Sequence, residues 1–153
     1  MDEAVARAIH VVAVVIWIGG VGFVTMIVLP ILRARREPGE SMTVFRAVEE
    51  RFARLARGAV LLAGLSGLYL LYRLDLWDRF QSPRFWWMHA MVIIWLLFAA
   101  MLFVVEPLGL DRRAEVAAEA DFARLARLHW VLLAASLVTV FGAVAGSHGV
   151  LFF

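Results

Sequence analysis

Four stretches of this chain contain no Asp, Glu, Lys or Arg, and this segregation of charge restricts the fold more than any other feature. The stretches are residues 8–32, 58–72, 85–105 and 128–153. A transmembrane helix needs about 20 apolar residues, because it crosses a hydrocarbon core of about 30 Å at about 1.5 Å per residue. Three stretches satisfy this length alone, and the 58–72 stretch does so when flanking apolar residues extend it. The sequence therefore predicts an all-α fold, a polytopic membrane four-helix bundle.

We expect residues 1–153 to form a single transmembrane domain. Its helices are predicted at about residues 5–32, 52–76, 84–107 and 122–153. Apolar residues also recur at helical spacing over 42–55 and 116–125. This periodicity indicates that the second and fourth helices begin as amphipathic extensions beneath the membrane.

The composition agrees with a membrane protein and excludes other classes. Hydrophobic residues make up 63% of the chain, whereas soluble domains contain about 45–50%. A soluble enzyme, a disordered chain and a nucleic-acid-binding module are therefore excluded. The net charge of +2 is small, and all 15 basic residues are Arg, so the basic character reflects loop arginines near lipid headgroups more simply than nucleic-acid binding. Because the chain has no Cys, disulfides, thiolate metal sites, iron–sulfur clusters and covalent haem attachment are excluded too.

The arginines are unequally distributed between the two predicted sides of the membrane. One side holds Arg33, Arg35, Arg36, Arg46, Arg51, Arg54, Arg57, Arg112, Arg113, Arg124 and Arg127. The opposite side holds Arg7, Arg73, Arg79 and Arg84. Cytoplasmic loops of membrane proteins carry the excess of basic residues. We therefore expect an N-out, C-out, multi-pass protein of the bacterial inner (plasma) membrane.

A repeat predicts that the chain arose by duplication of a two-helix hairpin. The hexapeptide Phe-Ala-Arg-Leu-Ala-Arg occurs at residues 52–57 and again at 122–127, each time directly before an apolar helix. His10 precedes Trp17 by seven residues, and His89 precedes Trp95 by six. Hairpins with an even number of spans share one orientation, so a pseudo-two-fold axis along the membrane normal would relate them. In that arrangement His10 and His89 face one another.

Every histidine of the chain lies inside a charge-free stretch. Ionisable side chains in a bilayer are costly and usually face the bundle interior, so each is a candidate functional residue. The predicted topology places His10, His89 and His148 at a similar shallow depth in the outer leaflet. His129 lies alone near the cytoplasmic face. We predict His10 and His89 as metal ligands, with His148 as a supporting or alternate ligand.

Haem b is the cofactor that this pattern favours, because it takes two axial nitrogens from opposing helices. Trp17 is predicted to pack against the porphyrin. Arg7, which shares a helix face with His10, and Arg84 are predicted to neutralise its propionates at the outer surface. Glycines on the first, second and fourth helices would leave room for a flat macrocycle, although glycines in membrane helices more often serve close packing.

Two other chemistries use imidazoles without thiolates. Copper is one, because Met88 and Met91 flank His89 and supply soft thioether ligands. A proton path without a metal is the other.

The first helix carries a resemblance to a known family. Residues 8–20 read Ala-Ile-His-Val-Val-Ala-Val-Val-Ile-Trp-Ile-Gly-Gly, a His, six residues, a Trp and then small residues. This pattern resembles the first helix of the HemJ-type membrane protoporphyrinogen oxidases and of the CopD-like copper-resistance membrane proteins. Glu49, Glu50 and Arg51, the Gly-rich stretch 62–71 and Trp-Trp-Met-His-Ala-Met at 86–91 are similar to the HemJ-type layout. The resemblance covers about residues 5–105.

The HemJ-type resemblance implies a haem b protein of four-helix scale, with an axial His in its first helix, which is His10 here. It also implies a functional Lys in the third helix. This chain contains no Lys, and Met91 stands nearest to that position. The resemblance therefore implies haem binding without carrying over protoporphyrinogen oxidation.

The predicted function is a haem b-binding integral membrane protein, bis-His ligated in the outer leaflet and acting in electron transfer or a small redox reaction. A copper-handling, CopD-like membrane protein is the alternative, and a non-catalytic membrane assembly subunit is the third reading. The expected partners are the lipid bilayer and a redox partner, and no nucleic acid. The spacing of Gly142 and Gly146 suits either a homo-oligomer or the bundle interior.

Overall fold

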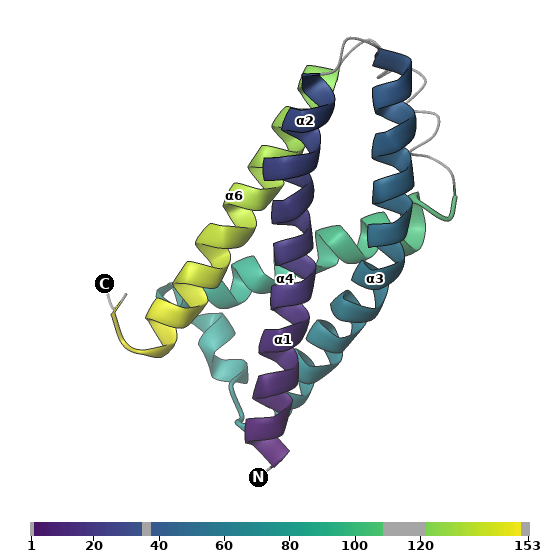
Figure 1. Cartoon of the computed structure of the whole chain (residues 1–153). Helices are drawn as coiled ribbons and strands as arrows, with labels where there is room; N and C mark the ends of the chain where they lie inside the picture. The colour runs from purple at the N-terminus through teal and green to yellow at the C-terminus, as the bar shows by residue number, and fades with distance from the viewer. Residues whose placement is uncertain (1, 35–37, 109–121, 151–153) are drawn as a thin grey trace.

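The computed structural model describes residues 2–34, 38–108 and 122–150, and it is helical throughout apart from short connections (Figure 1). The elements are α1 (Asp2–Phe23), η1 (Val24–Val28), α2 (Leu29–Arg33), α3 (Pro38–Arg73), η2 (Trp77–Gln81), η3 (Pro83–Phe85), α4 (Trp86–Ala100), η4 (Met101–Val105) and α6 (Phe122–Ser147). They form four continuous helical rods, each long and apolar enough to cross a membrane. The predicted all-α four-helix membrane bundle is confirmed.

The four rods pack as a closed ring. α1 contacts α3, α3 contacts α4, α4 contacts α6 and α6 contacts α1. The centre is a cluster to which every rod contributes, with Trp17 of α1, Val60 of α3, Phe98 of α4 and Leu133 of α6 all nearly inaccessible. A second cluster lies toward the α2 end, where Leu32 packs with Phe45. Small residues between the helices allow this close approach, as is usual for membrane bundles.

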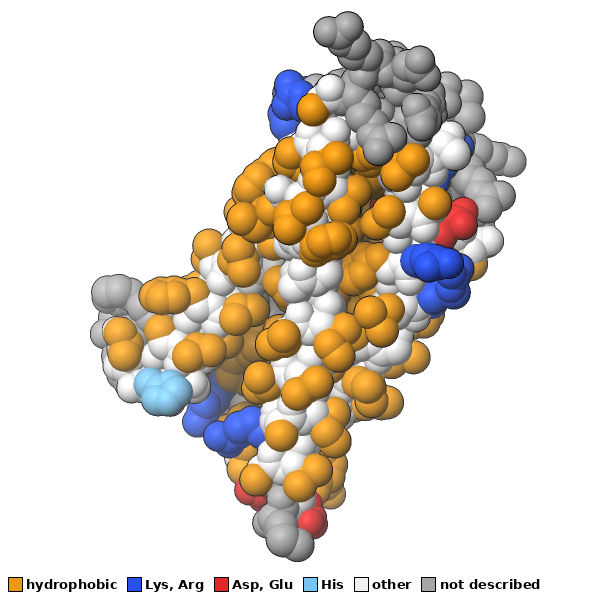
Figure 2. Space-filling view, viewed as in Figure 1, with side chains coloured by type: hydrophobic (Ala, Val, Ile, Leu, Met, Phe, Trp, Pro, Cys, Tyr) orange, Lys and Arg blue, Asp and Glu red, His pale blue; other side chains and the backbone are white. Residues whose placement is uncertain are grey.

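Charged and apolar surfaces are separated along the molecule. In Figure 2, hydrophobic side chains cover the middle of the visible face, while charged side chains gather along the upper and right-hand margin and at the lower end.

The first rod, Asp2–Arg33, has 32 residues, or about 48 Å of rise, which exceeds a hydrocarbon core of about 30 Å. This rod is therefore long enough to tilt in the bilayer or to extend its charged ends into the headgroup regions. Figure 1 shows α4 inclined steeply to α1 and α3 in turn.

The second helix begins and ends differently from its predicted bounds of 52–76. α3 starts at Pro38, which confirms the amphipathic extension in front of residue 52. It ends at Arg73 because Asp75 adopts a left-handed conformation with φ 49°. The amide of Leu76 then donates to the carbonyl of Leu71, 3.1 Å away. A bond spanning six residues around a left-handed residue is the Schellman motif, which closes a helix.

The fourth helix ends in the same way, so its predicted continuation to residue 153 is not what the structure has. α6 runs over Phe122–Ser147. Gly149 has φ 77°, and the amide of Val150 donates to the carbonyl of Ala145 at 3.0 Å. Residues 151–153 and the extension predicted over 116–121 lie outside the described residues. The first and third rods, Asp2–Arg33 and Pro83–Val105, lie within a few residues of their predicted bounds.

A distinctive backbone feature occurs once in each half of the chain, as far as the described residues extend. The first rod contains a π-helical turn, Val24–Val28, two residues before Pro30, and the third contains one, Met101–Val105, two residues before Pro107. In both, the residue before the proline, Leu29 or Glu106, donates its amide to the carbonyl five residues earlier. A proline removes an amide donor and clashes with the preceding turn, which the wider π turn relieves. The repeat of these turns, together with the two matching helix ends, supports the predicted hairpin duplication.

Candidate functional site

His10 lies in a cradle formed by one turn of α3, residues 63–67. Its Nδ1 is 2.9 Å from the carbonyl oxygen of Ala63 and 3.1 Å from Oγ of Ser66. Gly67 faces the ring, and a Cβ there would lie 3.1 Å from Cε1 of His10. The imidazole therefore fits against α3 because position 67 carries no side chain.

The partners of His10 define which of its ring nitrogens carries the proton. The Ala63 carbonyl only accepts a hydrogen bond, so Nδ1 must donate to it. The Ser66 hydroxyl donates to the carbonyl of Leu62 in its own helix, which leaves its oxygen free to accept from Nδ1 as well. In the neutral form of the imidazole, Nε2 is then the nitrogen that carries the lone pair. A histidine that donates one ring N–H to a carbonyl and presents the other nitrogen is the usual form of a metal-ligating histidine.

His89 lies near the start of α4 and is held differently. Its Nε2 is 3.0 Å from the carbonyl oxygen of Phe80 in η2, and the two rings meet edge to face with centroids 5.3 Å apart. The ring is exposed. Because the Phe80 carbonyl accepts from Nε2, Nδ1 carries the lone pair in the neutral form of this imidazole.

The other two histidines bond to their own helix. Nδ1 of His148 is 2.8 Å from the carbonyl of Val144, at the exposed end of α6. Nδ1 of His129 is 3.0 Å from the carbonyl of Leu125, and its ring meets Phe45 edge to face near the α2 end of the bundle. His129 therefore lies at the other end of the bundle from the other three histidines.

The side chains of His10 and His89 bond to different elements, His10 to α3 and His89 to η2. The rods α1 and α4 meet where Trp17 and Phe98 form an edge-to-face pair with centroids 5.0 Å apart. From this crossing, His10 lies along α1 against α3, whereas α4 runs to the end of α6, where Trp87 packs on Gly146. Within the described residues, no group of three or more His, Asp or Glu side chains is placed to hold a metal ion.

The remaining predicted site residues lie around this region. Arg7 and Arg84 are exposed, in α1 and η3, on the side predicted to be outer. Trp17 is only 4% exposed, and its indole Nε1 has no hydrogen-bond partner among the described residues. The corresponding Trp95 is satisfied, because its Nε1 donates to the carbonyl of Val60 at 2.8 Å. An unpaired buried donor is costly in an apolar interior, so the bundle centre retains one unmet polar group.

Four of the glycines predicted to make room for a macrocycle, Gly20, Gly64, Gly142 and Gly146, instead receive aromatic rings of the chain itself. A Cβ added to these glycines would lie within 3 Å of a ring atom, in the pairs Gly20–Phe52, Gly64–Trp95, Gly142–Trp86 and Gly146–Trp87. Gly64 thereby lets the Trp95 indole reach the Val60 carbonyl. In this structure the small residues serve close packing between helices.

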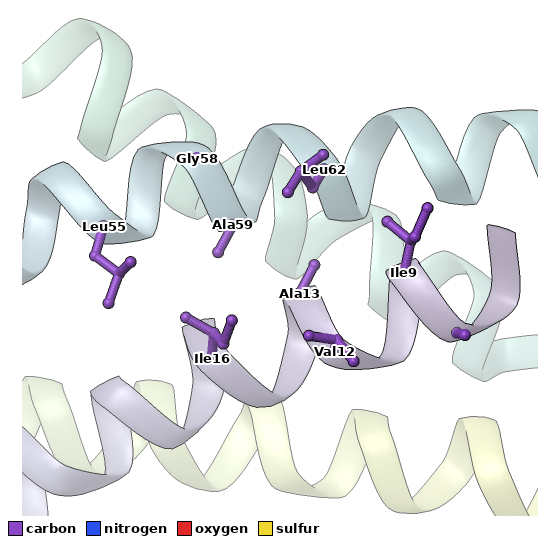
Figure 3. Close-up of a pocket in the computed structure, with 9 residues that line it drawn as sticks. Ile9, Val12, Ala13, Ile16, Leu55, Gly58, Ala59 and Leu62 are labelled. Carbon is purple, nitrogen blue, oxygen red and sulfur yellow. The ribbon is translucent and has the colours of Figure 1, made fainter. Parts of the chain in front are cut away.

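Two features were not predicted from the sequence. Arg57 forms an ion pair with Glu106 at 2.8 Å, and its Nε donates to the carbonyl of Leu102 at 3.2 Å, inside η4. An open apolar groove of about 470 Å³ also runs between α1 and α3. Figure 3 shows Ala13 and Ile16 extending from α1 toward Leu55 and Ala59 of α3 across this groove. Small residues at 8, 13, 58 and 59 were the available sequence signal.

The chain was compared with known families and proteins. No family model matches it, and no curated protein and no solved structure matches it either.

Proposed function

We propose that the protein binds haem b in the outer half of the bundle, with His10 as an axial ligand, and that it acts in electron transfer or a small redox reaction. His89 is the proposed second ligand, and His148 is its alternate. The bacterial inner membrane is the proposed location.

The single observation that supports this proposal is the cradle of His10. An ionisable side chain inside a bilayer is costly and is therefore usually functional. The imidazole of His10 is oriented by two acceptors on the neighbouring helix α3. That arrangement fixes the ring and leaves Nε2 as a ligand, as the supporting residues of metal-binding histidines do.

His89 fits the role of second ligand less closely than His10 fits the first. Its free nitrogen is Nδ1, and its Nε2 is held by a backbone carbonyl in the short η2 segment. The exposed position at the start of α4 leaves the ring free to exchange that carbonyl for another partner. His148 is similarly exposed and presents Nε2, which is why it is the alternate ligand.

When bound, haem b supplies one-electron chemistry at its iron. The chain's own residues would hold and orient the group. Ala63 and Ser66 would fix the orientation of the His10 ring. Arg7 and Arg84 are exposed on the predicted outer side and would neutralise the haem carboxylates there. Two imidazole ligands leave no open iron position, which favours electron transfer over oxygen chemistry.

The test is a reduced-minus-oxidised spectrum of the purified protein, recorded together with iron and copper analysis. We expect a haem b spectrum at one haem per chain, lost in His10→Ala and weakened in His89→Ala or His148→Ala. His129→Ala is the matched control and should keep its haem. A full haem complement in His10→Ala would contradict the ligand assignment. Stoichiometric copper without haem would replace the proposal with copper handling, and absence of both would favour an assembly subunit.

A further inference from the structure

We propose that the groove between α1 and α3 binds an anionic phospholipid of the cytoplasmic leaflet, with one acyl chain in the groove and the phosphate at Arg51. This inference is independent of haem binding. It rests on the shape and apolarity of the groove and on the exposed position of Arg51 at one end. It also rests on the ion pair of Arg73 with Glu3 beyond the other end.

The groove has the character of a site for a hydrocarbon chain. Its lining consists of apolar side chains and one glycine: Ala8, Ile9, Val12, Ala13, Ile16, Leu55, Gly58, Ala59 and Leu62. Ala13 and Ala59 form a buried floor, while Val12, Leu55 and Leu62 are more than half exposed along its rims. A Cβ added to Gly58 would meet nothing within 4 Å, in contrast to the glycines filled by aromatic rings. The groove is therefore open to the membrane and has no polar group to bind water or a polar ligand.

Arg51 lies at the cytoplasmic end of this groove. It is one helical turn before Leu55 and two turns before Gly58, so it shares their face of α3. Its side chain is exposed and makes no ion pair or hydrogen bond with any part of the described chain. Side chains on a helix tilt toward its N-terminus, which for α3 is the predicted cytoplasmic side. A phosphate there would meet an arginine that lacks a partner.

The depth of Arg51 agrees with the headgroup region. About 33 Å of helix rise separates Arg51 from Arg73 at the outer end of α3, close to a hydrocarbon core of about 30 Å. The groove residues Leu55 to Leu62 span about 10 Å of rise next to Arg51. An acyl chain of the cytoplasmic leaflet occupies half of the core, or about 15 Å. The groove thus accommodates most of one chain whose headgroup is at Arg51.

At the outer end of the same face of α3, the basic side chain is already in an ion pair. This difference between the two ends determines at which end an anionic headgroup would bind. Arg73 lies three turns after Leu62 and is paired with Glu3 of α1 at 3.8 Å. The charge available to an anionic headgroup is therefore at the Arg51 end. Basic residues beside helix grooves on the cytoplasmic side are the common recognition element for anionic lipids.

The test is a lipid titration of the purified full-length protein, followed by native mass spectrometry. Phosphatidylglycerol and phosphatidylcholine with identical acyl chains are compared. We expect about fivefold tighter retention of phosphatidylglycerol. Arg51→Gln should abolish this preference and Arg51→Lys should keep it. Arg54→Gln is the matched control, because Arg54 is also exposed but lies about a quarter turn away from the groove face.

A second variant tests the acyl-chain half of the site. Gly58→Leu should fill the groove and reduce retention of both lipids, while photoactivatable acyl chains should label peptides containing residues 8–16 and 55–62 in the unaltered protein. Equal retention of the two lipids, equal effects of Arg51→Gln and Arg54→Gln, or no effect of Gly58→Leu would each overturn the proposal. Cross-links from the groove to a second copy of the chain would assign it to a dimer instead.

Discussion

Arg57 of α3 and Glu106 at the end of η4 form an ion pair of 2.8 Å that connects the two predicted hairpins. Arg57 also donates from Nε to the carbonyl of Leu102. Leu102 lies within the π-helical turn, where the regular helical hydrogen bonding is interrupted. Arg57 therefore stabilises a backbone irregularity as well as a neighbouring carboxylate.

This double role predicts unequal effects of removing the two partners. Both side chains are about one-third exposed, so the ion pair itself is worth only about 1 kcal/mol. We expect Glu106→Gln to lower the free energy of unfolding by about that amount, and Arg57→Gln by about 2 kcal/mol, because it also loses the Leu102 bond. Unfolding in mixed micelles measures both, and the double variant should resemble Arg57→Gln alone. Equal losses in the two single variants would contradict the role of Leu102.

Ser66 supports the proposed ligand His10 and predicts an effect on haem affinity. Its oxygen is one of two acceptors of the His10 Nδ1 proton, and loss of such a partner typically lowers metal-site affinity by about 10–100-fold. Since the Ala63 carbonyl remains, we expect about a tenfold loss for Ser66→Ala in a haem titration of the apoprotein. Ser136→Ala is the control, because Ser136 is also buried and bonds to a carbonyl of its own helix, Leu132. Equal affinities of the two variants would remove Ser66 from the site.

Gly146 and Gly19 predict opposite responses to the same substitution. A Cβ at Gly146 would lie 2.5 Å from the ring of Trp87, which is itself buried, whereas a Cβ at Gly19 meets nothing within 4 Å. Gly146→Ala should therefore cost about 1–3 kcal/mol through overpacking. Gly19→Ala should be neutral or stabilising by up to about 1 kcal/mol through helix propensity. Thermal unfolding in detergent ranks the two, and a stable Gly146→Ala would show that α4 and α6 can separate freely.

Trp17 and Trp95 occupy corresponding places in the two halves but differ in hydrogen bonding. Trp95→Phe loses the bond to the Val60 carbonyl, while Trp17→Phe removes a donor that has no partner among the described residues. Both substitutions remove a similar volume, so we expect Trp95→Phe to be more destabilising by about 1 kcal/mol. Chemical unfolding of the two variants gives the difference. A larger loss for Trp17→Phe would mean that its indole N–H is bonded after all.

The orientation of the bundle has a direct test, because the chain contains no Cys. Single-cysteine variants Ser82→Cys and Ala34→Cys place a thiol on opposite ends of the bundle. With both termini outside, a membrane-impermeant maleimide should label Ser82→Cys in intact spheroplasts and Ala34→Cys only after lysis. The reverse pattern would invert the predicted topology and move Arg51 to the outer leaflet.

The fold could be predicted from the sequence because its main determinant is local. Charge-free stretches of sufficient length must become helices in a bilayer, whatever their neighbours are. Helix ends were less accessible to prediction. Asp75 ends α3 through a left-handed conformation that most residues avoid. The spacing of apolar residues does not show at which residue the backbone adopts this conformation.

The candidate site was predicted only in part, for a physical reason. The cost of an imidazole in the membrane singled out His10, but its partners depend on how α1 packs on α3. The carbonyl of Ala63 is a backbone group that any residue would supply, so no pattern of side chains in the sequence predicts this hydrogen bond. The groove and the Arg57–Glu106 pair likewise arise from the contact of helices that are distant in sequence.

The repeated π-helical turns bear on the history of the chain. A π turn adds one residue to a helix without breaking it, and the same addition occurs before Pro30 and before Pro107. If the two halves arose by the predicted duplication, a shared insertion of this kind would date from the ancestral hairpin, two copies of which would have assembled as a symmetric pair. Fusion would then have allowed the two halves to diverge. One half keeps an imidazole in a cradle and an indole without an acceptor, while the other has fully bonded its indole into the bundle.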